Sequence, residues 1–235
     1  PETNRNMKKE VITLSLGGSL IIPEDINYNY LKEFKEVILK HTDKYKFVIV
    51  CGGGSLARKY ISTLEKENLD SKFQSLAGIS ATRTNARFIS YFFRQNQKKG
   101  IPHRLREVKK RIKKQNIVFC GALEYHPKET SDTTAARISK KLKTKFVNLT
   151  DTNGLYTEDP RKNKDAKLIP KISWKEFNKK SKEIDFKPGQ HFILDQKSSK
   201  IILKKKIPTY ILGPDLKEFE NFLNRKDFKG TTIKK

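Results

Sequence analysis

The sequence is poor in the residues that build disulfide scaffolds, metal clusters or membrane spans. Its 235 residues include 2 cysteines, 1 methionine and 1 tryptophan. No apolar run approaches the roughly 20 residues of a membrane-spanning helix, and we expect no signal peptide before the first strand. Cys51 and Cys120 lack metal-ligand spacing, which favours small buried thiols in a reducing cytoplasm over a disulfide. We therefore expect a cytoplasmic globular protein with no membrane partner.

Acidic residues are also scarce relative to basic ones. The chain has 26 Asp and Glu against 51 Lys and Arg, a net charge of +25. Such an excess raises nucleic acid as a partner. However, most of the cations are lysines spread along helix-like segments, not an arginine-rich arm with interleaved aromatics. This pattern favours a lysine-rich solvated surface, which would also attract anionic nucleotides, and it leaves nucleic acid as an alternative that is not favoured.

Strand-like and helix-like segments alternate along most of the chain. This alternation predicts an α/β fold, a three-layer αβα sandwich with a mostly parallel open sheet. The predicted strands are residues 10–16, 46–51, 116–122, 145–149, 207–213 and 230–235. The predicted helices are residues 28–42, 55–69, 82–100, 130–143, 198–206 and 215–225. Residues 158–177 are highly charged and irregular, which indicates a solvent-facing loop or β-excursion.

The boundaries of this domain are soft. Residues 1–9 lack an apolar pattern and are expected to be a tag or a disordered N-terminus. Residues 10–235 are expected to form one domain that divides softly into two halves, residues 10–149 and 150–235.

Glycines follow three of the predicted strands. The segments are LSLGGS with Gly17 and Gly18, VIVCGGGS with Gly52 to Gly54, and IVFCGA with Gly121. Glycine admits positive φ and has no Cβ, so consecutive main-chain N–H groups can converge on a phosphate at the start of a helix. A single such loop is most often only a turn, but two at strand ends of one α/β chain favour a phosphate site. Neither loop is a Walker loop, and neither has the GxGxxG spacing.

Larger segments of the chain resemble the amino acid kinase superfamily, and within it the archaeal type of uridylate kinase. They run in order almost from end to end: LSLGGSL, VIVCGGGSLARKYI, GISATRTNARFI, HPKETSDTTAARIS, NLTDTNGLYTEDPRKNKDAKLI, ILDQKSSKII and GTTI. The resemblance implies the amino acid kinase fold and transfer of the ATP γ-phosphoryl group to UMP, giving UDP for pyrimidine nucleotide synthesis. It also implies an acceptor-binding half at 10–149 and an ATP-binding half at 150–235. Further implications are Mg²⁺ held mainly by the nucleotide phosphates, no protein metal site, and a homo-oligomer, in relatives a hexamer.

Matching positions give the candidate site residues. The resemblance implies catalytic roles for Asp132 and Arg58; Asp132 would organise the catalytic groups, although Thr130 to Asp132 also read as a simple helix cap. The implied ATP-binding residues are Gly18, Ser19, Gly54, Arg58, Thr150, Asp151, Tyr156 and Asp159. The implied acceptor-binding residues are Gly53, Ser75, Tyr125, His126, Pro127, Lys128, Glu129, Thr130 and Ser131.

Three departures from the family pattern bear on the acceptor and the mechanism. Ser15 stands where many members of the superfamily have a lysine, so another cation must face the moving phosphoryl group, and Lys197 and Lys200 are candidates. Ser75 replaces an aspartate that would hold the acceptor ribose. Residues 123–131 form a longer and more charged loop than the family's usual acceptor loop, which has a form like GGTHPGHTTD. Two alternatives stay open: a kinase of this fold with another small phosphate or carboxylate acceptor, and a catalytically weak nucleotide- or RNA-binding relative.

Overall fold

The computed structural model describes residues 9–95, 100–127, 129–183 and 194–235. Within them, seven strands form one sheet in the order β3-β2-β1-β4-β6-β7-β5. All neighbouring strands are parallel except the antiparallel pair β6 and β7. The strands are β1 Glu10–Leu16, β2 Tyr45–Cys51, β3 Ile117–Cys120, β4 Lys145–Leu149, β5 Lys171–Ser173, β6 Thr209–Leu212 and β7 Gly230–Lys234. The prediction of a mostly parallel open sheet is confirmed.

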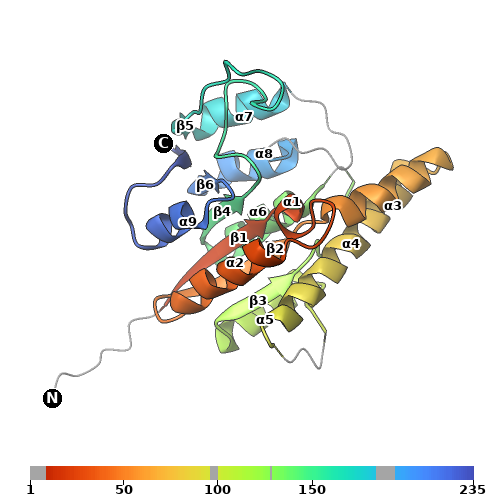
Figure 1. Cartoon of the computed structure of the whole chain (residues 1–235), viewed down its shortest axis with the longest axis horizontal. Coiled ribbons are helices and arrows are strands. Elements are labelled where there is room, and N and C mark those ends of the chain that lie inside the picture. The colour runs from red at the N-terminus through yellow and green to blue at the C-terminus, as the bar shows by residue number, and fades with distance from the viewer. Residues whose placement is uncertain (1–8, 96–99, 128, 184–193) are drawn as a thin grey trace.

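Helices cover both faces of this sheet. Alternate strand residues enter two separate apolar clusters, because successive side chains of a strand point to opposite faces. One cluster packs under α1, α2, α4 and α9, and the other under α5, α6, α7 and α8. The helices are α1 Gly18–Ile21, α2 Tyr28–Lys40, α3 Gly54–Lys66, α4 Ser71–Phe92, α5 Leu105–Lys114, α6 Ser131–Leu142, α7 Trp174–Lys182, α8 Gln196–Lys205 and α9 Leu216–Leu223. The three-layer prediction is confirmed (Figure 1).

Helices α3 and α4 lie side by side and project beyond the sheet (Figure 1). Helix α4 begins at Ser71, where the Asp70 carboxylate accepts hydrogen bonds from the main-chain N–H groups of Lys72 and Phe73. The sequence-based start of this helix, at residue 82, was therefore wrong. The error arose because the glycine at position 78 weakens the helical pattern, while the aspartate cap restores the start.

The segment after β4 makes an antiparallel excursion before the chain returns to the sheet. Tyr156 and Leu168 form an isolated antiparallel bridge. The prediction of a loop or β-excursion holds there and for β5, but it misses the first turns of α7. That helix starts with a capping box, in which Ser173 and Glu176 satisfy each other's main-chain N–H groups.

Both cysteines are free and buried, as predicted. They enter different apolar clusters on opposite faces of the sheet, so their sulfur atoms are separated by the sheet itself. Within the described residues, no helix is both long and apolar enough to cross a bilayer. The predicted disordered N-terminus, residues 1–9, lies almost wholly outside the described residues, and the division into two halves stays a prediction.

Candidate functional site

The first two glycine turns pack back to back at the ends of β1 and β2. These strands are neighbours in the sheet. A Cβ atom on Gly18 would lie 2.0 Å from the main-chain nitrogen of Gly54, and one on Gly52 would lie 2.4 Å from the nitrogen of Gly18. No side chain fits at either position. The glycines therefore allow two main chains to approach where two ligand-binding loops of a parallel sheet are expected.

Asn85 of α4 fixes the direction of the peptide groups in the second turn. Its side-chain amide donates to the carbonyl oxygens of Gly52 at 2.8 Å and Gly53 at 3.1 Å. All peptide bonds in the described chain are trans, so each N–H points opposite to the preceding C=O. The N–H groups of Gly53 and Gly54 therefore point away from Asn85. Gly54, with φ of +60°, opens α3, whose first-turn N–H groups have no acceptor within the helix.

Arg58 of α3 lies on the α1 side of these turns. Its Nη2 donates to the carbonyl oxygen of Pro23 at 2.7 Å and lies 3.7 Å from the Glu24 carboxylate. In this structure the guanidinium thus fastens α3 to the segment that follows α1. Its predicted contact with phosphate stays a prediction.

Two carboxyl groups meet where the N-termini of α6 and α8 converge. Asp132, in the first turn of α6, accepts a hydrogen bond of 2.8 Å from the hydroxyl of Ser15 on β1. Asp195 caps α8 and accepts hydrogen bonds from Thr133 at 2.7 Å and from Thr130 at 2.5 Å. Ser15 precedes the first glycine turn by two residues, so this carboxyl pair lies beside that turn.

The environment of Asp132 favours its protonated form. The residue keeps some accessible surface, but its carboxyl group lies deep among protein atoms, and this burial, together with the negative charge of Asp195, raises the pKa of Asp132 to about 7. The hydrogen bond from Ser15 opposes the rise. Asp132 can therefore change its charge near neutral pH, as groups at functional sites often do. Thr130 also accepts from the Asp132 N–H at 3.1 Å, so the predicted cap is present beside the carboxyl pair.

The predicted acceptor loop follows β3 and is anchored at its start by α4. Arg83 donates to the carbonyl oxygens of Ala122 and Leu123, and Thr82 accepts from the N–H of Ala122 at 2.9 Å. Burial lowers the pKa of Arg83. Further along, Tyr125 and His126 are half-buried, Pro127 is exposed, and Thr130 and Ser131 open α6. The predicted residue Lys128 lies outside the described residues.

Ser75 lies two turns before Thr82 on α4. Residues seven apart in a helix share a face, so Ser75 looks toward the same side as Thr82. Its hydroxyl donates to the carbonyl oxygen of Ser71 at 2.7 Å. The structure therefore does not join Ser75 to the acceptor loop by a hydrogen bond, and its predicted substrate contact stays a prediction.

Two of the predicted ATP residues, Asp151 and Asp159, contact Arg161 in the segment after β4. Its guanidinium lies 3.0 Å from Asp159 and 3.7 Å from Asp151. These contacts raise the pKa of Arg161 and lower that of Asp159. Thr150 donates its main-chain N–H to Leu212 at 3.0 Å. The ion pairs fix Asp151 and Asp159 relative to each other, and half-buried Tyr156 sits in the antiparallel bridge between them in sequence.

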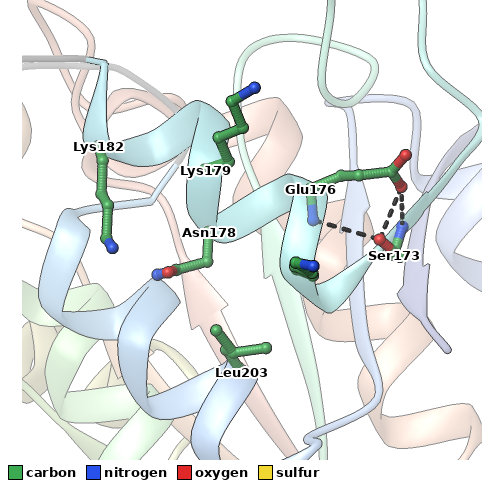
Figure 2. A pocket seen from close by; sticks show the side chains of 7 residues that line it. Ser173, Glu176, Asn178, Lys179, Lys182 and Leu203 are labelled. Carbon is green, nitrogen blue, oxygen red and sulfur yellow. Dashed lines mark hydrogen bonds between the residues drawn. The ribbon is translucent and has the colours of Figure 1, made fainter.

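A separate hollow of about 710 Å³ lies between α7 and α8 (Figure 2). It is lined by Ser173, Lys175, Glu176, Asn178, Lys179, Lys182 and Leu203. None of these is a predicted site residue, and Ser173 and Glu176 are engaged in the cap of α7. None of the residues predicted to bind phosphate therefore lines this hollow.

The structure adds residues that the sequence analysis did not assign to the site. Asn85 orients the second glycine turn, and Asp195 with Thr133 holds the start of α6. Asn85 and Asp195 lie in the segments GISATRTNARFI and ILDQKSSKII, which were noted only as part of a resemblance. In the sequence, Asp195 is an aspartate just before a predicted helix. An ordinary helix N-cap has the same pattern, so the pattern did not indicate a site residue.

The fold and the glycine turns place the chain among α/β proteins whose ligands bind beyond the carboxyl ends of parallel strands. A model of the Amino acid kinase family matches residues 10–213, and the chain belongs to this family.

Among similar proteins, a uridylate kinase of Methanococcus aeolicus is 31% identical over 94% of this chain and 98% of its own length. A uridylate kinase of Pyrococcus abyssi is 30% identical, also over 94% and 98%. The crystal structure of uridylate kinase from Archaeoglobus fulgidus matches with a TM-score of 0.79 and 27% identity over 94% of this chain and 99% of that one.

Proposed function

We propose that this protein is an ATP-dependent uridylate kinase, which converts UMP to UDP in pyrimidine nucleotide synthesis. Similarity to uridylate kinases over 94% of the chain supports the activity. The observation that carries the site is the contact between two glycine turns, one of which has its peptide N–H groups turned away from Asn85. Main-chain N–H groups at a helix start are suited to bind phosphate oxygens.

The reaction joins an oxygen of the UMP phosphate to the γ-phosphorus of ATP and breaks the bond from that phosphorus to the β-phosphate oxygen. Such a transfer needs positioning and charge stabilisation rather than a covalent intermediate. Gly18, Ser19, Gly54 and Arg58 would hold the ATP phosphates, and Gly53 would face the acceptor phosphate. Asp132, which lies in the first turn of α6 and accepts a hydrogen bond from Ser15, would position these groups relative to each other.

The base and sugar of each nucleotide would lie to either side of the phosphates. Thr150, Asp151, Tyr156 and Asp159 form the proposed adenine-nucleotide side, supported by the ion pairs that fix this segment. Acceptor contacts are assigned to Ser75 and to the loop after β3, namely Tyr125, His126, Pro127, Lys128, Glu129, Thr130 and Ser131.

Magnesium would enter with the nucleotide. Among the described residues, no three His, Cys, Asp or Glu side chains are grouped as they would be around a metal ion. The carboxyl pair is already engaged by hydroxyl groups of Ser15, Thr130 and Thr133. Bound Mg²⁺ would neutralise phosphate charge, with its ligands supplied mainly by the phosphates themselves.

A coupled assay of ADP release tests this function. The wild-type protein is supplied with ATP and Mg²⁺ and with UMP, CMP, AMP or isopentenyl phosphate in turn. We expect turnover with UMP at a kcat/KM well above that for the other acceptors. Turnover with another acceptor alone would replace UMP as the substrate, and the absence of turnover with all four would remove the proposed activity.

We also infer that the protein works in the cytoplasm as a homo-oligomer, a hexamer by resemblance. The projecting pair α3 and α4 exposes large apolar side chains, with Tyr60 46%, Phe73 52% and Leu76 38% accessible. Side chains of this kind are enriched at protein interfaces. Light scattering should show a homo-oligomer for the wild type and a smaller species for Phe73→Glu, because the added charge would disrupt an apolar interface.

A further inference from the structure

The first turn of α8 contacts the predicted acceptor loop through two charged side chains. Asp195 accepts from Thr130, the last residue before α6. Lys197, two residues further along α8, donates to the carbonyl oxygen of Pro127 and lies 3.7 Å from the carboxylate of Glu129. The end of the loop is thus tied to α8 by a main-chain contact, an ion pair and a hydroxyl hydrogen bond.

Glu129 is the centre of this arrangement. Its side chain is only 9% exposed and lies 2.6 Å from the guanidinium of Arg137 on α6. A carboxylate this deep is stable only with paired charges, and Arg137 and Lys197 supply two. Together, Glu129, Arg137 and Lys197 connect the loop to both α6 and α8. We call these three residues the loop cluster.

The other end of the loop is held differently. Arg83 and Thr82 of α4 bind its first residues through main-chain groups. The loop is therefore attached to α4 at its start and to the loop cluster at its end, and Tyr125 and His126 lie between these two points of attachment. Because the anchor on α4 includes the buried side chain of Thr82, whereas Lys197 is partly exposed, the anchor at α8 is the one whose loss would move the loop.

We propose that Lys197 is a positioning residue for the acceptor: it holds the loop end on α8 in the shape that receives the acceptor nucleotide. This role rests on the proposed function for the identity of the acceptor, but the tether itself does not. Lys204, two turns further along α8, is exposed, has no assigned role in the site and provides a matched control. Of the two lysines that the sequence offered as cations, the structure thus assigns a contact with the acceptor loop to Lys197.

The kinetic test compares Lys197→Met, Lys197→Arg and Lys204→Met with the wild type. Lys197 is 42% exposed, and Glu129 keeps its ion pair of 2.6 Å with Arg137, so the loss of Lys197 should change stability little. For Lys197→Met we expect the KM for UMP to rise about tenfold, the size of one lost charge-assisted hydrogen bond, with the KM for ATP changed less than about twofold. Lys197→Arg should restore most of the loss, and Lys204→Met should match the wild type. An unchanged KM for UMP, or an equal rise in both KM values, would overturn the proposal.

A second measurement does not depend on which acceptor is used. Hydrogen–deuterium exchange of the ligand-free protein should be faster in Lys197→Met across residues 121–127, and unchanged across the glycine turn at residues 52–54. Identical exchange in the loop would overturn the tether even if UMP is the acceptor. Failure of UMP turnover in the wild type would instead refute the proposed function and leave this measurement to decide the tether.

Discussion

The glycine turns and the acceptor loop lie at the same edge of the sheet but are held in place by different forces. At the turns, main chain packs on main chain, with Gly18 so close to Gly54 that no Cβ fits between them. At the loop, side chains from α4, α6 and α8 carry the contacts, and several of them are charged. Main-chain packing tolerates almost no substitution, whereas charged tethers permit replacement and fine adjustment. The glycine turns, where we propose that phosphate binds, are therefore held rigidly, and the proposed acceptor loop is held by contacts that permit more substitution.

The largest effect is expected for a substitution at Gly18, because an added side chain would disrupt the packing of the two glycine turns. Gly18→Ala places a Cβ atom 2.0 Å from the Gly54 nitrogen. We expect a loss of at least about 3 kcal/mol in the free energy of unfolding, from overpacking, and a loss of at least about 100-fold in kcat/KM, from displaced phosphate donors. Urea denaturation and the coupled assay measure the two.

Gly78→Ala is the matched control for that change. Gly78 lies within α4, and its added Cβ would come no closer than 3.4 Å to Ile61. Replacing a helical glycine by alanine should stabilise by about 0.5–1 kcal/mol. If Gly18→Ala behaved like Gly78→Ala, the close packing of the two turns would be wrong.

Asp132→Asn tests the carboxyl pair that joins the two regions. We expect kcat to fall about 100- to 1000-fold, the range for removing one preorganised electrostatic group. The affinity for ATP, measured by calorimetry, should change less than about threefold, because ATP is assigned to the glycine turns and the segment after β4. A kcat near that of the wild type would contradict the role of Asp132.

The same substitution should raise stability at alkaline pH. The pKa of Asp132 is about 7 in the folded protein and 3.8 for an ordinary aspartate. Because the folded pKa is the higher one, the stability contributed by the protonated group is full below pH 3.8 and is lost as the pH rises through 7. Asparagine cannot ionise, so the melting temperature of Asp132→Asn should exceed that of the wild type by several degrees near pH 8.5 and match it near pH 3. An equal difference at both pH values would contradict the raised pKa.

Asn85→Ala tests whether the second glycine turn depends on the hydrogen bonds from the Asn85 side chain. The change removes the side-chain donor to both carbonyl oxygens. The Gly53 oxygen keeps a main-chain N–H of α3 at 3.2 Å, while the Gly52 oxygen loses its side-chain donor, at a cost of about 1–3 kcal/mol. We expect the KM values for ATP and UMP to rise together, unlike the selective change at Lys197. Thr84→Ala, at an exposed neighbouring position of α4, is the control and should leave both KM values unchanged.

Ser15→Ala should give the smallest effect. The Ser15 hydroxyl lowers the pKa of Asp132, so its removal should move the pH midpoint of kcat upward while the rate at pH 8 changes less than about threefold. A pH–rate profile of both proteins measures the shift. A midpoint that does not move would show that Asp132 does not control the rate through its charge.

The same contrast explains what could be read from the sequence. Alternating strands and helices predicted the layers and the parallel sheet, and the glycine runs predicted the turns, because both signals are local. The tethers of the loop were not predicted, since Lys197 and Pro127 lie 70 positions apart and Arg83 and Leu123 lie 40 apart. Asp195 looked like an ordinary cap, and only the fold brings it to Thr133. Ser75 and Arg58 remain predictions, because in this structure their side chains bond elsewhere.

The most direct test is a crystal structure with a non-hydrolysable ATP analogue, Mg²⁺ and UMP. We predict that the terminal phosphate of the analogue lies within hydrogen-bond distance of the main-chain N–H groups of Gly18 and Gly54, with the UMP phosphate facing it at Gly53. Phosphates found instead in the lysine-lined hollow between α7 and α8, or glycine turns that contact neither nucleotide, would contradict the account.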